Sequence, residues 1–136
     1  MASPNFNTIK AVIDNKTPPL QAIHVYHQGD PTGTTRTLWP HVLGTNNGKE
    51  MVLCYQYDGH SKIPLKPNFS KKNFRCFEVS KLTDPSGSAN PYVKVITFTP
   101  INPPPPAGPT WTPFEFKVKD VKRQNCVDED EVETFR

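Results

Sequence analysis

The sequence predicts a mainly β protein, in which a small barrel of five short strands follows one N-terminal helix. The chain has 136 residues, the size of one domain. It contains 16 prolines, and proline is poorly tolerated inside helices. After the first segment, apolar residues alternate with polar ones, which is the period of strands. Short strands separated by turn residues are typical of small barrels.

The first segment, residues 3–15, is the one predicted to be helical. Ser3 is a suitable N-cap, and Pro4 suits the first helical position. The segment carries one apolar stripe at helical spacing, formed by Phe6, Ile9, Val12 and Ile13. The prolines that follow end the helix, because the residue before a proline is disfavoured in the α conformation. We expect this helix to pack over one end of the sheet.

Five strands are predicted from the alternating segments that follow the helix. They span residues 20–27, 34–39, 50–57, 73–79 and 92–98. Pro40 is expected to end the second strand, since proline cannot donate a hydrogen bond to a β ladder. The Asn47-Gly48 pair predicts a tight turn between the second and third strands.

The composition changes after Phe98, which predicts a boundary. Residues 1–99 are expected to form the helix and the barrel. Residues 100–113 are proline-rich, which favours an extended polyproline II linker or a segment that docks into an aromatic groove of a partner. Residues 114–136 predict an edge strand followed by an acidic tail.

Charge and cysteine content limit the compartment and the partners. The formal net charge is +3, and five acidic residues lie in the stretch 128–136, so the rest of the chain is more basic. A basic body permits a nucleic-acid partner. The three cysteines are an odd number without a paired motif, which favours a reducing compartment over a secreted disulfide framework. With no signal peptide and no membrane-length apolar segment, we expect a cytoplasmic protein without a membrane partner.

Motifs for catalysis are missing from the sequence. There is no phosphate-binding loop and no nucleophile elbow. Cys54 and His41 can be drawn as a nucleophile and its base, but the apolar strand around Cys54 favours a buried, inert thiol. No cysteine lies at zinc-finger spacing to a histidine. We therefore expect a protein that is not an enzyme, with no catalytic residues, no metal and no cofactor.

An ordered set of motifs lies in three segments: RTLWPHVLG at 36–44, GKEMVLCYQ at 48–56 and FRCFEVSKL at 74–82. The first is an arginine-led strand that ends in Pro-His-x-Leu-Gly. The second begins at a turn glycine and ends in Tyr-Gln. The third combines aromatic and basic residues. In this order, and over about residues 9–82, the chain resembles the WYL domain family.

The resemblance implies an Sm-like, SH3-type β-barrel with an N-terminal helix. It also implies a ligand-sensing part of bacterial regulators or of phage-defence systems, with nucleic-acid or nucleotide ligands. The polar residues that match the family pattern are the candidate ligand-binding residues: Tyr26, Arg36, His41, Tyr55, Gln56, Ser61 and Arg75. The chain departs from the family at Glu50-Met51-Val52, where the family has Trp-Tyr-Leu. It also has too few residues before Leu20 for the usual winged helix-turn-helix.

The residue types support a binding role independently of the resemblance. Arginine offers a charged, planar fork for phosphate, and tyrosine offers a face on which a base stacks. The alternative is that Arg36 and Arg75 pair with acids and that the tyrosines fill the core. We expect a ligand-binding module for single-stranded nucleic acid or a nucleotide, in a regulatory or phage-defence-associated protein. The alternative function is a protein–protein interaction module that uses the proline-rich segment and the C-terminal strand. A regulator or defence protein as partner and a homodimer are left open.

Overall fold

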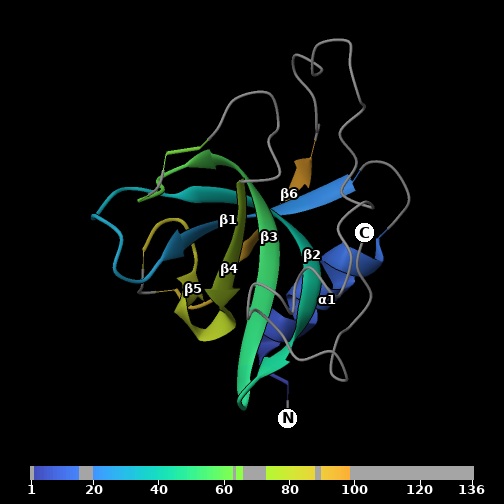
Figure 1. Cartoon of the computed structure of the whole chain (residues 1–136). Helices are drawn as coiled ribbons and strands as arrows, with labels where there is room; N and C mark the ends of the chain where they lie inside the picture. The colour runs from blue at the N-terminus through green and yellow to red at the C-terminus, as the bar shows by residue number, and fades with distance from the viewer. Residues whose placement is uncertain (1, 16–19, 63, 66–72, 88–89, 99–136) are drawn as a thin grey trace.

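The computed structural model describes residues 2–15, 20–62, 64–65, 73–87 and 90–98. It confirms the mainly β fold class, with one helix and a curled antiparallel sheet that forms half of a barrel (Figure 1). In chain order the elements are α1 (Pro4–Asp14), β1 (Leu20–His27), β2 (Arg36–Asn46), β3 (Lys49–Gly59), β4 (Phe74–Glu78), the 3-10 helix η2 (Val79–Lys81), β5 (Leu82–Thr83) and β6 (Lys94–Phe98).

The helix α1 begins where the sequence predicts. Oγ of Ser3 accepts the backbone N–H of Phe6 at 3.2 Å, and Pro4 is the first helical residue. The N–H of Ser3 also donates to the carboxylate of Glu50 on β3 at 2.9 Å. The start of the helix is therefore fixed both by its own cap and by a side chain from the sheet.

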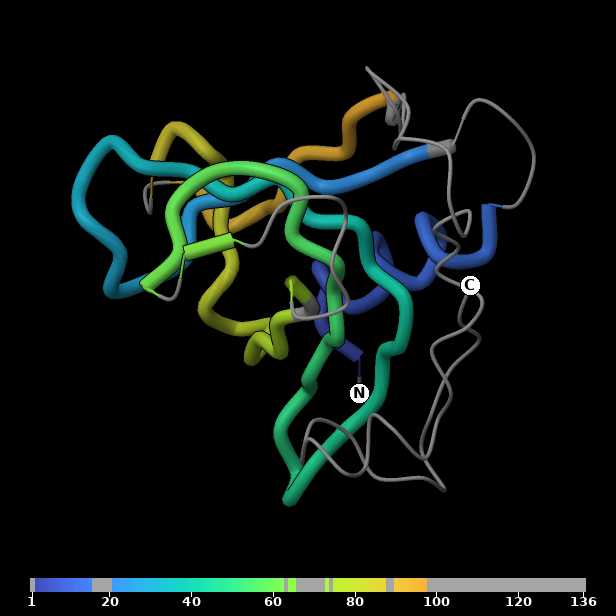
Figure 2. The backbone as a smooth tube through the Cα atoms, turned by 45° about the horizontal axis from the view of Figure 1, so that its top comes forward, coloured from blue at the N-terminus to red at the C-terminus, as the bar shows by residue number. Residues whose placement is uncertain are grey.

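The long hairpin of β2 and β3 contains the expected turn and one unexpected continuation (Figure 2). Asn47 and Gly48 have φ angles of 53° and 79°, the left-handed conformation that a two-residue hairpin turn requires. The prediction that Pro40 ends the second strand is wrong, because β2 continues to Asn46. A register shift between Pro40 and Val42 interrupts the ladder beside the proline, and such a bulge accommodates its missing N–H donor.

The sheet has the strand order β4-β3-β2-β1-β5, and β6 pairs with β1 beside β5. β6 pairs with Leu20–His24, whereas β5 pairs with Tyr26 and His27. One edge of β1 is thus shared by two short strands, which lets the sheet curl. The two-residue β5 is too short to be predicted from alternation. The strands predicted at 73–79 and 92–98 correspond to the shorter β4 and β6.

The core lies between α1 and the inner face of the curled sheet. It combines Ile9, Val12, Ile13, Ile23, Val25, Leu38, Leu43, Val52, Cys54, Phe77, Val79, Leu82 and Val93. The predicted apolar stripe of the helix supplies the first three, with Phe6 packed against them. Strand alternation explains why Val52 and Cys54 face inward together. Gln56 and Arg36 continue this inner face toward one end, where the interior becomes polar.

The predicted linker 100–113 and the predicted edge strand and acidic tail at 114–136 lie outside the described residues. Among the described residues, no helix is long and apolar enough to cross a membrane. The predictions of a cytoplasmic location and of a homodimer stay predictions.

Candidate functional site

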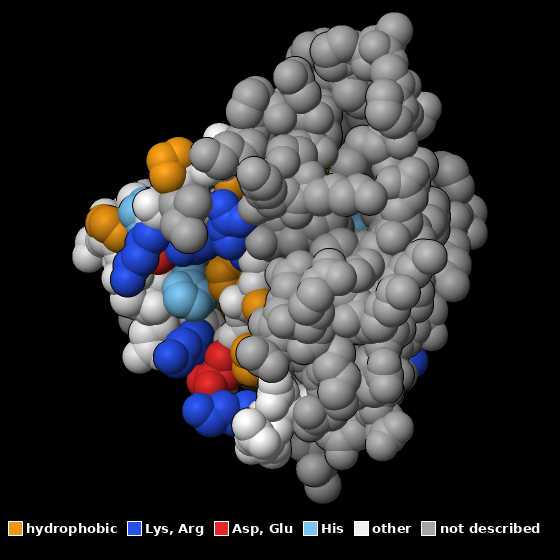
Figure 3. All heavy atoms as spheres, viewed as in Figure 1, with side chains coloured by type: hydrophobic (Ala, Val, Ile, Leu, Met, Phe, Trp, Pro, Cys, Tyr) orange, Lys and Arg blue, Asp and Glu red, His pale blue; other side chains and the backbone are white. Residues whose placement is uncertain are grey.

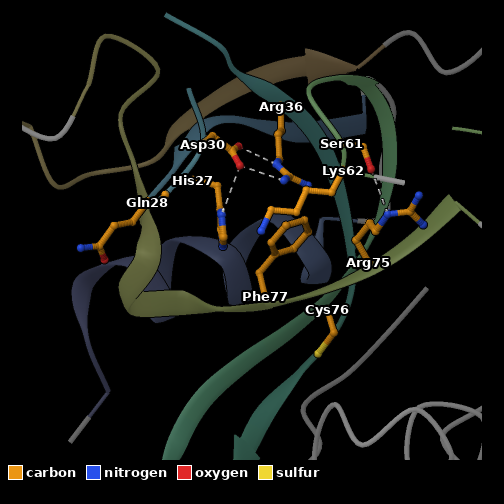
Figure 4. A pocket seen from close by; sticks show the side chains of 10 residues that line it. His27, Gln28, Asp30, Arg36, Ser61, Lys62, Arg75, Cys76 and Phe77 are labelled. Carbon is orange, nitrogen blue, oxygen red and sulfur yellow. Dashed lines mark hydrogen bonds and ion pairs between the residues drawn. The ribbon is translucent and has the colours of Figure 1, made fainter. Parts of the chain in front are cut away.

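A cavity of about 290 Å³ lies at the polar end of the half-barrel. It is lined by His27, Gln28, Gly29, Asp30, Arg36, Ser61, Lys62, Arg75, Cys76 and Phe77. These residues come from the β1–β2 connection, the start of β2, the segment after β3, and β4 (Figure 4). Figure 3 shows Lys, Arg and His side chains gathered on the side of the molecule where these segments meet.

The inner wall of the cavity is built around Asp30 and Arg36. Nε and Nη2 of Arg36 donate to the two carboxylate oxygens of Asp30 at 2.8 and 3.0 Å. Nη1 of Arg36 donates to Oε1 of Gln56 at 2.9 Å. All three side chains are buried, and we call them the buried network. A two-point arginine–carboxylate pair fixes the orientation of both groups as well as balancing their charges.

The charge of Asp30 is held by its surroundings. Burial alone would raise the pKa of Asp30, but the hydrogen bonds and charge of Arg36, with weaker contributions from His27 and His60, keep it below the ordinary value. The hydroxyl of Tyr26 donates to the carbonyl of Asp30 at 2.6 Å. The turn that carries Asp30 is therefore tied to β1, and Tyr26 acts on the site by positioning the turn.

Gln56 connects the buried network to the segment after β3. Its Nε2 donates to the carbonyls of Asp58 at 3.3 Å and of His60 at 2.7 Å. The N–H of His60 donates in turn to the carbonyl of Thr35 at 3.0 Å. The amide of Gln56 thereby uses its oxygen for Arg36 and its nitrogen for the chain that leads to the cavity opening.

Ser61, Lys62 and Arg75 line the cavity at exposed or partly exposed positions, and we call them the rim. Nε of Arg75 donates to Oγ of Ser61 at 3.3 Å. Figure 4 shows Lys62 reaching across the cavity toward Arg36 and the Phe77 ring. Burial and the nearby charge of Arg36 lower the pKa of Arg75, with Tyr55 acting in the opposite direction. The positive charges of Lys62 and Arg75 therefore lie on the same cavity as that of Arg36.

One aromatic ring and one imidazole complete the lining. The guanidinium carbon of Arg36 lies 5.2 Å from the centroid of the Phe77 ring. The same ring meets His27 edge-on, with centroids 5.3 Å apart. Burial and the charge of Arg36 lower the pKa of His27, whereas Asp30 raises it. His27 therefore lines the cavity beside the buried network.

Four of the predicted ligand-binding residues, Tyr26, His41, Tyr55 and Gln56, do not line the cavity. Tyr26 and Gln56 support its walls, whereas His41 and Tyr55 lie away from it. The rings of Trp39 and His41 lie 5.1 Å apart, and the rings of Tyr55 and Tyr57 lie 5.2 Å apart. His41 and Tyr55 are both buried. Tyr55 alternates along β3 with core residue Cys54, so it faces the opposite side of the sheet. The structure brings together Arg36, Ser61 and Arg75 at the cavity, with Gln56 and Tyr26 as supports.

The cysteines differ from one another. Cys54 is free and fully buried, and burial raises the pKa of its thiol. His41, which the sequence offers as a base for Cys54, contacts the ring of Trp39 instead. Cys76 is disulfide-bonded, which departs from the expectation of reduced thiols. The described part of the chain contains no group of three or more His, Cys, Asp or Glu side chains that could hold a metal ion.

Sequence reasoning missed Asp30, His27, Lys62 and Phe77. Asp30 lies in Gly29-Asp30-Pro31, which the sequence presents as an ordinary turn. The available signal was the need of a buried arginine for a carboxylate, since an unpaired buried charge is costly. Asp30 is the acid closest in the chain to Arg36. Lys62 follows Ser61 directly, and Phe77 lies two residues after Arg75 on the same face of β4. The positions of Ser61 and Arg75 could therefore have indicated both residues.

Comparisons of the chain with protein-family models, with curated proteins and with solved structures gave no match. The resemblance to the WYL domain family therefore rests on the ordered motifs alone and stays a prediction. The function of the chain has to be argued from the charges, distances and burial at the cavity.

Proposed function

We propose that the protein is a binding module that holds an anionic ligand of the nucleotide or single-stranded nucleic-acid type in the cavity. The observation that carries this proposal is the charge of the lining. Among the described lining residues, Arg36, Lys62 and Arg75 are cations, and Asp30 is the one carboxylate. Both oxygens of that carboxylate already accept from Arg36. An entering phosphate would balance the excess positive charge of the rim.

The size and the lining of the cavity support a small ligand or one end of a larger one. A volume of about 290 Å³ lies at the lower end of known ligand pockets. The Ser61 hydroxyl beside Arg75 adds a hydrogen-bonding group at the rim. Three of the residues that match the pattern of the WYL domain family, Arg36, Ser61 and Arg75, are at the cavity. This placement supports a regulatory or phage-defence-associated sensing role.

The direct test is binding of a labelled oligothymidylate, followed by fluorescence anisotropy over a salt series. Lys62→Ala combined with Arg75→Ala should weaken binding at least about tenfold, because two phosphate contacts are removed. Each lost contact should reduce the slope of log affinity against log salt by about 0.7. A matched control is Lys10→Ala with Lys49→Ala, which removes two cations that pair with Asp14 and Glu78 away from the cavity.

The same measurement can reject the proposal. An affinity that does not change with salt would exclude phosphate recognition. Equal losses in the rim variant and in the control variant would show that general positive charge, and not the cavity, attracts the oligonucleotide.

A second candidate function, protein–protein interaction, is supported by β6. Tyr92 and Val95 are exposed apolar residues, 57% and 37% accessible, at and just before this strand. Among the described strands, β6 pairs with β1 alone, so it is an edge strand. A chain truncated after Phe98 should lose partner capture if residues 99–136 supply the interaction. If β6 supplies the interaction, capture should be lost in the double variant Tyr92→Ser with Val95→Thr. Capture that persists in this variant would exclude β6.

A further inference from the structure

Two imidazoles lie beside the carboxylate of the buried network. Nδ1 of His27 is 3.7 Å and Nε2 of His60 is 3.8 Å from Oδ1 of Asp30. The same oxygen accepts Nη2 of Arg36 at 3.0 Å. The imidazole distances are too long for hydrogen bonds but short enough for electrostatic coupling. One buried oxygen is therefore coupled to three basic groups from three segments of the chain.

Burial and the charges of Arg36 and Lys81 oppose the protonation of His27. Asp30 lies in the same turn, Arg36 comes from β2 and Lys81 from η2, while His60 lies across the carboxylate. The rim adds Lys62 and Arg75 on the same cavity. Among the described residues, Asp30 is the one acid that acts on His27, and Arg36 already binds both of its oxygens. Burial and Arg36 accordingly lower the pKa of His27.

An anion in the cavity would reverse this balance. It would place negative charge beside the imidazole, between His27 and the cations of the rim, and nearby negative charge favours the protonated form. The coupling is reciprocal, since a ligand that favours the proton must itself be bound more tightly by the protonated protein. His27 is suited to this role because its charge changes near neutral pH.

We infer that an anion bound in the cavity draws a proton onto His27, so that ligand binding strengthens as the pH falls. The inference rests on the proposed function and adds a form of regulation to it. Acidification or ligand release would change the charge of His27, at a site that Arg36, Asp30 and His60 already hold in place. The buried network thereby connects the ligand to the protonation of the cavity wall.

The test uses oligothymidylate of four nucleotides without a terminal phosphate, because its own charge is constant between about pH 5.5 and 8. Affinity should rise about tenfold or more from the higher to the lower pH, within the roughly 5–150-fold range of such couplings. His27→Gln should remove most of this rise. His24→Gln is the matched control, since His24 bonds Thr35 and is not among the cavity-lining residues.

Imidazole NMR signals of the unmodified protein give a readout that does not depend on a variant folding. The titration midpoint of His27 should move to higher pH when the oligothymidylate is added. Equal affinity at both pH values, or a pH dependence kept in His27→Gln, would overturn the inference while leaving the binding function intact. Absence of binding at both pH values would overturn the proposed function together with the inference.

Discussion

Two arginines at the same cavity show how differently one residue type can be used. Arg36 is 6% accessible and binds a carboxylate through two nitrogens and an amide oxygen through a third. Arg75 is only partly buried, and its Nε donates to the hydroxyl of Ser61. The pKa of Arg75 is lowered by burial and by the charge of Arg36. The buried network is a closed electrostatic unit, whereas the rim lies nearer to solvent.

The difference follows from the cost of burying charge. A guanidinium inside a protein must be matched by acceptors, and the Asp30–Gln56 pair supplies them for Arg36. A cation near solvent has no such requirement. Substitutions in the buried network should therefore reduce stability first, and substitutions in the rim should reduce ligand affinity first.

The largest effect is expected for Asp30→Ala. The change leaves the Arg36 guanidinium buried without its carboxylate, and breaking a buried pair in this way costs about 3–5 kcal/mol. The free energy of unfolding, measured by urea denaturation, should fall by that amount. Asp14→Ala is the control, because Asp14 forms an exposed pair with Lys10 within α1 worth about 0.3–0.5 kcal/mol. Similar losses in the two variants would show that the Asp30–Arg36 pair stabilises the fold no more than an exposed pair does.

Gly59→Ala should have the next largest effect. Gly59 lies in the chain between Gln56 of the buried network and Ser61 of the rim. Gly59 has a φ of +99°, and a Cβ there would lie 2.1 Å from the carbonyl oxygen of Thr35. Backbone strain and overpacking each cost about 1–3 kcal/mol, so a loss of at least about 2 kcal/mol is expected. Gly48→Ala keeps the positive φ without a clash and should cost about 1 kcal/mol. Equal losses, measured by urea denaturation, would show that the contact with Thr35 is not tight.

The pH dependence of stability should follow Asp30. Its pKa is lower in the folded protein than in the unfolded chain, so its stabilisation is present above about pH 4 and is lost as the pH falls through the folded pKa. The difference in free energy of unfolding between the natural chain and Asp30→Asn should be constant above about pH 5. Below about pH 4 this difference in free energy should shrink, by about 1.4 kcal/mol in total for each unit by which folding lowers the pKa of Asp30. A difference that grows on acidification would contradict the pairing.

Much of the fold could be predicted from the sequence because the local signals agree with the tertiary structure. The cap at Ser3, the Asn47-Gly48 turn and the alternation along β3 all act over a few residues. The continuation of β2 through Pro40 could not be predicted, since it depends on a bulge formed with another strand. β5 is defined by its pairing with Tyr26 and His27 of β1, a contact between distant segments that local alternation does not signal.

The candidate site was predicted in part for a related reason. Alternation places Arg36 and Gln56 inward, but the resemblance also selected His41 and Tyr55, which the structure places away from the cavity. His41 lies at the shift between Pro40 and Val42, where the alternation is interrupted. Asp30 was missed because a turn residue gives no sign of burial. A partner for a buried charge is found from packing, which the chain order does not reveal.

The smallest effect is expected for Ser61→Ala, and it bears most directly on the rim. The change removes one acceptor of Arg75 at a partly exposed position, so the free energy of unfolding should fall by less than about 1 kcal/mol. Oligothymidylate affinity should fall about three- to tenfold, since Arg75 loses the contact that orients it. Ser80→Ala is the control, because Ser80 bonds Glu78 away from the cavity. A loss of stability without a loss of affinity would make the rim as structural as the buried network.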